Sequence, residues 1–128
     1  MIPLSPEHDS TAHEIVDSAF AVHRALGPGL LESVYEQCLT YELQSRGYKI
    51  ERQVGLPVVY RDVRLEAGFR IDILVNDLIV IELKTVERLL PIHEAQLLTY
   101  LKLSGKRLGL LLNFNVPLIK DGIRGLAL

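Results

Sequence analysis

The segment 69–84, FRIDILVNDLIVIELK, places charged side chains in the most apolar part of the chain. Two runs rich in Ile, Leu and Val flank a polar turn at 76–77, and this pattern predicts two paired β-strands. Burial of an unpaired charge in such a segment is heavily penalised. The presence of Asp72, Glu82 and Lys84 there therefore constrains the fold more than any other feature of the sequence.

The length of the connecting loop decides which side chains share a face, because side chains alternate along a strand and directly paired residues lie on the same face. A two-residue turn would place Asp72 and Glu82 on opposite faces. A three-residue loop, Asn76–Leu78, with a bulge would place them opposite each other. One face would then be wholly apolar, comprising Phe69, Ile71, Ile73, Val75, Ile79, Ile81 and Leu83. We predict this odd loop, which leaves Arg70, Asp72, Leu74, Val80, Glu82 and Lys84 on the other face.

In this register the carboxylates of Asp72 and Glu82 repel, and each raises the pKa of the other unless a cation lies nearby. A hard divalent ion suits the pair, because Mg²⁺ takes a few carboxylate oxygens and completes its coordination with water and phosphate. Lys84 points to the same side and is suited to polarise a water or to stabilise an anionic transition state. The alternative is an exposed ion pair of Glu82 and Lys84 at a strand edge, with Asp72 beside a turn.

The rest of the chain changes from helical to extended periodicity and back. Apolar spacing predicts a first helix that is capped by Asp9 or Ser10 and stops at the Gly27–Gly29 break. The other predicted elements are a helix at 31–46, strands at 54–60, 69–75 and 78 or 79 to 84, a helix at 91–104, a buried strand at 107–114 and a tail at 116–128 that adds a short strand or an edge extension. This order predicts an α/β fold.

The composition limits the number of domains, the partners and the cellular compartment that we expect for this chain. Its 128 residues correspond to one domain, 1–128. A formal net charge of -2 gives no global field that would attract nucleic acid or an anionic membrane. The single cysteine, Cys38, excludes an internal disulfide and suits a reducing compartment. Without a signal-like start or a membrane-length apolar run, we expect a cytoplasmic protein that does not enter the membrane.

Two motifs resemble those of a known group of proteins. Ile71-Asp72 followed by Glu82-Leu83-Lys84, within a βββαβ order, resembles the PD-(D/E)XK nuclease superfamily, although Ile71 stands where the superfamily's name has proline. The segment GLLESVY at 29–35 matches the GxxExxY motif that names a family of small proteins in that superfamily. The resemblance covers nearly the whole chain. It implies a restriction-endonuclease-like core, in which a mixed central sheet is flanked by helices and preceded by two N-terminal helices.

The resemblance also implies a role for each matching acidic or basic residue. Asp72 and Glu82 are similar to the metal-binding carboxylates, and Lys84 to the catalytic lysine. Glu32 resembles the acidic residue that the first core helix contributes to catalysis and to the metal. An alternative for Glu32 is structural, since a carboxylate in the first turn of a helix is stabilised by the helix dipole.

Gln96 and Tyr100, in HEAQLLTYL, resemble the QxxxY motif of the RecB-type branch, whose residues line the site. They are four residues apart on one helical face, so they are predicted to contact substrate or to hold the charged residues in place. The alternative is a helix face on which Tyr100 only covers the core. Tyr35, three residues after Glu32, is predicted to be a packed support.

Together these features predict a metal-dependent phosphodiesterase that uses Mg²⁺ or Mn²⁺ to hydrolyse nucleic acid, with DNA as the expected substrate. The second hypothesis is a non-catalytic nucleic-acid or protein interaction module that reuses the same fold, which the negative net charge favours. A homodimer formed through the apolar segment 108–114 or through the tail is compatible with either.

Overall fold

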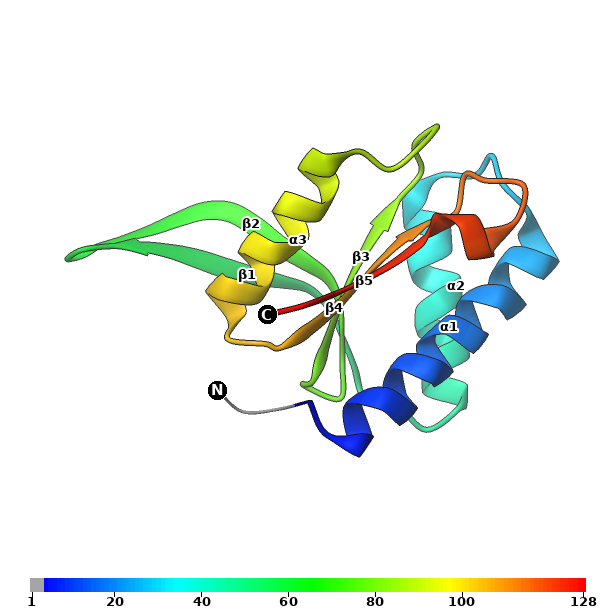
Figure 1. Ribbon diagram of the computed structural model, residues 1–128, viewed down its shortest axis with the longest axis horizontal. Coiled ribbons are helices and arrows are strands. Elements are labelled where there is room, and N and C mark those ends of the chain that lie inside the picture. The colour runs from blue at the N-terminus through cyan, green and yellow to red at the C-terminus, as the bar shows by residue number, and fades with distance from the viewer. Residues whose placement is uncertain (1–3) are drawn as a thin grey trace.

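The computed structural model describes residues 4–128 and contains a five-stranded mixed sheet with helices on both faces. Helices α1 (Pro6–Leu26) and α2 (Glu32–Ser45) pack on one face, and α3 (Pro91–Ser104) packs on the other (Figure 1). The α/β class and the two N-terminal helices are as predicted. The first helix begins earlier than expected, because Ser5 and not Asp9 or Ser10 provides its N-cap.

The strands follow one another across the sheet in chain order. They are β1 (Ile50–Tyr60), β2 (Val63–Val75), β3 (Ile79–Lys84), β4 (Leu108–Asn113) and β5 (Ile123–Ala127), with a short 3₁₀ turn, η1 (Ile119–Gly122), before the last. The β3–β4 pair is parallel and is joined by α3, whereas the other neighbouring strands are antiparallel. The three-strand meander and a tail that adds an edge strand confirm two of the predictions.

Strand β4 lies in the middle of the core. Leu110 and Leu112 pack into the cluster beneath α1 and α2, while Leu111 packs into the cluster beneath α3. This agrees with the predicted strand buried on both faces. The same burial corrects one expectation, because the segment 108–114 pairs with β3 and β5 and cannot serve as the surface of a homodimer.

The β2–β3 loop has the predicted odd length. Val75 pairs with Ile79 and Ile73 pairs with Ile81, and the N–H of Leu78 donates to the carbonyl oxygen of Val75 at 2.9 Å. Asn76 and Asp77 have left-handed backbone angles, with φ of 52° and 53°. Asn and Asp tolerate this conformation better than other non-glycine residues, which explains why a bulged loop forms here.

The apolar face of the hairpin is not continuous, contrary to the prediction. Ile73 packs into the core beneath α1 and α2, but Ile71, two residues earlier on the same strand, packs into the core beneath α3. The β1–β2 ribbon therefore turns over between these residues. Gln53, opposite this point on β1, has a φ of 51°, so a local backbone distortion accompanies the turn.

Beyond this turn β1 and β2 form a long ribbon that projects from the body of the molecule (Figure 1). In the described part of the chain, the pairing of β2 with β3 covers only Ile73 to Val75, so the outer half of β2 pairs with β1 alone. Strand β2 begins at Val63, six residues before the predicted start at Phe69. The ribbon thus leaves the sheet immediately beside Asp72.

Candidate active site

Asp72 and Glu82 face each other where β2 separates from β3. The backbone N–H of Asp72 donates to Oε1 of Glu82 at 3.1 Å, and the backbone N–H of Leu83 donates to Oδ2 of Asp72 at 2.8 Å. Each carboxylate therefore holds a backbone N–H of the other strand just past the last regular pair, Ile73 with Ile81. The structure brings the two acidic residues together on one face, as the odd loop requires.

Glu82 is buried and Asp72 is partly buried, and the pair is electrostatically unfavourable when both groups are charged. Glu82 is only 6% exposed, and burial together with the charge of Asp72 raises its pKa to about 8. Burial also raises the pKa of Asp72, against the opposing effect of the hydrogen bond from Leu83. A bound cation would relieve this repulsion, so the site favours either retained protons or a metal ion.

Glu32 begins α2 and contributes a third negative charge to this region. Burial raises its pKa first, the charge of Asp72 raises it further, and Lys84 acts in the opposite direction. Its helix has no side-chain hydrogen bond at the N-cap, Leu31. Glu32 thus lies where it interacts both with the helix dipole and with the charge of Asp72.

Lys84 and the α3 residues border the same site. The Nζ of Lys84 donates to Oε1 of Gln96 at 3.3 Å. Burial raises the pKa of Tyr100, and the charges of Glu82 and Asp72 raise it further. The QxxxY pair therefore lies beside the charged residues, in addition to any packing role that Tyr100 has in the core beneath α3.

Three residues that the sequence did not single out as a group form a hydrogen-bonded network beside Asp72. Glu36 is buried and accepts hydrogen bonds from Nε and Nη2 of Arg52 at 3.1 and 2.7 Å and from Nε2 of Gln53 at 2.6 Å. The Nε2 of Gln53 is also 3.5 Å from Oδ1 of Asp72. The sequence feature that points to Glu36 is its position four residues after Glu32, which places both side chains on the same helical face.

The donor set suits a cation that keeps much of its hydration. One oxygen each of Asp72 and Glu82 is engaged by backbone N–H groups, while Oε2 of Glu82 has no hydrogen bond within residues 4–128. Within the same residues no three His, Cys, Asp or Glu side chains gather into a metal-binding group. Two carboxylates with water and phosphate completing the coordination match the habits of Mg²⁺.

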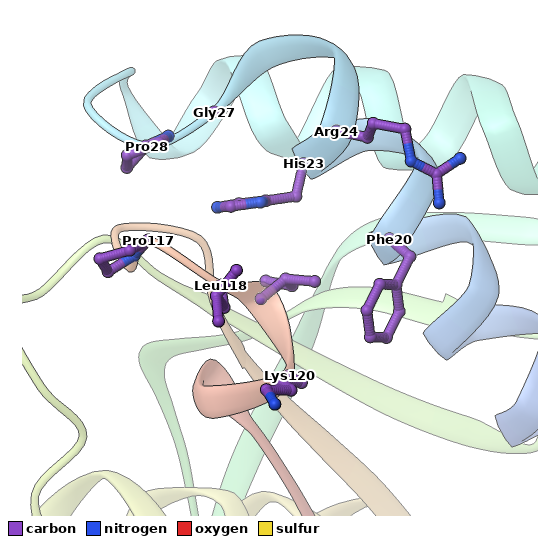
Figure 2. A pocket seen from close by; sticks show the side chains of 9 residues that line it. Phe20, His23, Arg24, Gly27, Pro28, Pro117, Leu118 and Lys120 are labelled. Atoms are coloured by element: carbon purple, nitrogen blue, oxygen red, sulfur yellow. The ribbon is translucent and has the colours of Figure 1, made fainter.

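A well-formed pocket lies away from these residues. It has a volume of about 380 Å³ and is formed by the end of α1, the Gly27–Pro28 turn and the segment 117–120 (Figure 2). His23 points into the gap between α1 and that segment, and its Nε2 lies 2.8 Å from the carbonyl oxygen of Val116. This contact connects α1 to the loop after β4.

Tyr35 supports the loop that leads into α2. Its ring is fully buried and stacks on Phe114, with ring centroids 4.6 Å apart. Its hydroxyl donates to the carbonyl oxygen of Gly27 at 2.5 Å and accepts from the N–H of Leu30 at 3.2 Å. Tyr35 thus fixes the turn immediately before Glu32 and acts as the packed support that its position suggests.

Replacing Tyr35 by Phe is expected to lower the free energy of unfolding by about 1–3 kcal/mol, because two backbone groups lose their partner. Urea denaturation measures the change. The matched control is Tyr41→Phe on the same helix, since Tyr41 is 75% exposed and its loss of a hydroxyl should have little effect. Equal stabilities of the two variants would show that the hydroxyl of Tyr35 does not hold the turn.

Comparison with protein families matches residues 9–126 to the PD-(D/E)XK nuclease superfamily. No curated protein and no solved structure gave a significant match. The helices and mixed sheet described above are consistent with the restriction-endonuclease-like core of that superfamily. Among the described residues, none of the helices has the length and apolar character needed to cross a bilayer.

Proposed function

Because the chain belongs to the PD-(D/E)XK nuclease superfamily, we propose that it is a metal-dependent phosphodiesterase that hydrolyses nucleic acid, with DNA as the preferred substrate. The observation that carries this proposal is the convergence of a buried carboxylate, Glu82, and a partly buried one, Asp72, at the point where their strands separate. Neutral side chains could accept the same backbone N–H groups without repulsion, whereas two facing acids suit a cation site.

The proposed roles follow from the position of each group. Asp72 and Glu82 would hold Mg²⁺ or Mn²⁺, and Glu32 would act through a water. When bound, the ion supplies Lewis-acid stabilisation of the negative charge on the phosphate. Lys84 would orient the attacking water, and Gln96 would fix the direction of its ammonium group through their hydrogen bond.

Membership of the GxxExxY family and a cytoplasmic location are part of the same proposal. The residues Gly29, Glu32 and Tyr35 support membership of the GxxExxY family within the superfamily. The role of Tyr35 in fixing the turn before Glu32 gives a physical reason for that spacing. Activity in the cytoplasm, where nucleic acid and Mg²⁺ are both present, is compatible with the single free cysteine.

A non-catalytic interaction module is the second candidate. Two observations favour it: the absence of a three-ligand metal group within residues 4–128, and the use of one oxygen of each carboxylate by backbone N–H groups. This module would bind its partner equally well with or without a chelator. A homodimer is compatible with both candidates and is tested by light scattering, with any interface lying outside β4.

The proposed activity predicts that purified protein cuts DNA in Mg²⁺ or Mn²⁺ and stops when EDTA is added, with recovery when metal is restored in excess. Asp72→Asn should abolish cutting, because the neutral amide no longer attracts the cation, while its oxygen can still accept the hydrogen bond from the N–H of Leu83. Labelled single-stranded, duplex and branched DNA and RNA, resolved on gels, provide the measurement.

Asp77→Asn is the matched control for this experiment. Asp77 lies in the loop of the same hairpin, and its carboxylate forms an exposed ion pair with Lys106. Its replacement should leave cutting unchanged. Cutting that persists in EDTA or in Asp72→Asn would contradict the proposed site, and a failure to cut any DNA or RNA form with either metal would favour the interaction module.

A further inference from the structure

A second, smaller pocket lies between β2 and α3 at the root of the projecting ribbon. It has a volume of about 150 Å³ and is lined by Phe69, Ile92, Ala95, Gln96, Thr99 and Tyr100. The rings of Phe69 and Tyr100 are 6.4 Å apart and tilted by 53°. Phe69 is 45% exposed, so an aromatic ring on a strand is open to solvent inside a concave surface.

This pocket shares two residues with the candidate active site. Gln96 lines the pocket and accepts the hydrogen bond from Nζ of Lys84. Tyr100 lines it as well, and the charges of Glu82 and Asp72 reach its hydroxyl. A molecule seated in the pocket therefore lies beside Lys84 and the two carboxylates.

The lining of the pocket indicates the kind of group it accepts. Phe69 and Tyr100 offer flat apolar surfaces, and the amide of Gln96 and the hydroxyl of Thr99 offer hydrogen-bonding groups next to them. A nucleobase has this combination of a planar ring face and a polar edge. Stacking on aromatic side chains is tolerant of base identity, because every base has a ring face.

We infer that the pocket receives one unpaired nucleobase of the substrate strand, next to the phosphate that Lys84 faces. The inference rests on the proposed function, since it is the active site that places a nucleic-acid strand here. Phe69 would stack on the base, and Gln96 would link base recognition to the orientation of Lys84.

The occupant determines the substrate class. A base within a duplex is covered on both faces by its neighbours and on its edge by its partner, so it cannot enter a pocket between a strand and a helix without leaving the stack. Single strands, frayed ends and loops present free bases at no such cost. The structure thus favours single-stranded or locally unpaired nucleic acid over intact duplex.

Binding measured in EDTA tests the pocket without any need for hydrolysis. Fluorescence anisotropy compares an oligothymidylate, an abasic phosphodiester chain of the same length and a blunt duplex. The native protein should bind the oligothymidylate about tenfold to a hundredfold more tightly than the abasic chain, the range that stacking of one base provides. Phe69→Ala should remove that difference, and the duplex should bind no better than the abasic chain.

Tyr60→Ala is the matched control, because Tyr60 is an exposed aromatic residue on the same ribbon that does not line the pocket. Tyr60→Ala should bind the oligothymidylate more tightly than the abasic chain, as the native protein does. Phe69→Leu should keep part of this difference. A base preference that survives in Phe69→Ala, a duplex that binds as tightly as the single strand, or no binding of any oligonucleotide would overturn the inference.

The two proposals fail in different ways. If the protein cuts duplex and abasic strands, and Phe69→Ala cuts them equally well, the base pocket is refuted and the nuclease proposal stands. If binding in EDTA depends on the bases but no cutting occurs in Mg²⁺ or Mn²⁺, the base pocket stands and the nuclease proposal is refuted.

Discussion

Lys84→Ala is expected to lower the rate of phosphodiester hydrolysis by about a hundredfold to a thousandfold at saturating metal, the usual effect of losing one preorganised charge-stabilising donor. The charge of Lys84 lowers the pKa of Asp72, of Glu82 and of Glu32, so its ammonium group acts electrostatically on all three acids. Its removal leaves the water and the developing phosphate charge without this partner. Single-turnover cleavage of labelled DNA measures the loss.

Lys102→Ala provides the comparison, because Lys102 is exposed on α3, the helix that carries Gln96. That variant should cut at the native rate. Substrate binding in EDTA should change only a few fold in Lys84→Ala, since a single cation contributes modestly to affinity for a strand. A cutting rate within tenfold of the native value would remove Lys84 from the chemistry.

Glu82→Gln should change how stability depends on pH. The pKa of Glu82 is about 8 in the folded chain, against an ordinary value of 4.5. Below pH 4.5 the carboxyl is protonated in both states and carries no penalty. Between pH 4.5 and pH 8 the unfolded chain releases the proton first, so the native protein loses stability, and above pH 8 the loss is complete. Gln cannot ionise and avoids this loss.

The variant is therefore expected to become more stable than the native protein as the pH rises through this window, by roughly 4 kcal/mol at its upper end, since one pKa unit corresponds to about 1.4 kcal/mol. Urea denaturation in EDTA at several pH values measures the difference. Saturating Mg²⁺ at pH 8 should stabilise the native protein and have little effect on Glu82→Gln. Parallel stability curves for the two proteins would refute the buried acidic pair.

Much of the site was predictable because strand pairing obeys a strict alternation. An even or an odd loop at 76–78 decides whether Asp72 and Glu82 meet, and the cost of burying a carboxylate on each face of the hairpin favours the odd loop. The helix 91–104 was equally clear, since Pro91 opens it and Gly105, with a φ of 72°, ends it.

Other features depended on tertiary contacts that a linear pattern does not carry. Alternation along β2 predicts that Ile71 and Ile73 share a core, yet the ribbon turns over at Gln53 and sends them to different cores. The outer part of β2 was also missed, because 63–68 lacks the dense apolar pattern of 69–75. Glu36 went unnoticed because its partners lie on another element.

The exchange of backbone N–H groups between Asp72 and Glu82 makes these acids part of the scaffold as well as of the chemistry. Truncating Asp72 to Ala would leave the amide of Leu83 without an acceptor where the strands part, at a cost of about 1–3 kcal/mol. An ancestor or descendant of this chain that cut nothing would still have reason to keep the aspartate. The motif therefore has a structural role of its own. Asp72→Asn distinguishes the two roles, because its side chain can keep the hydrogen bond from Leu83 while it loses the charge that binds a cation.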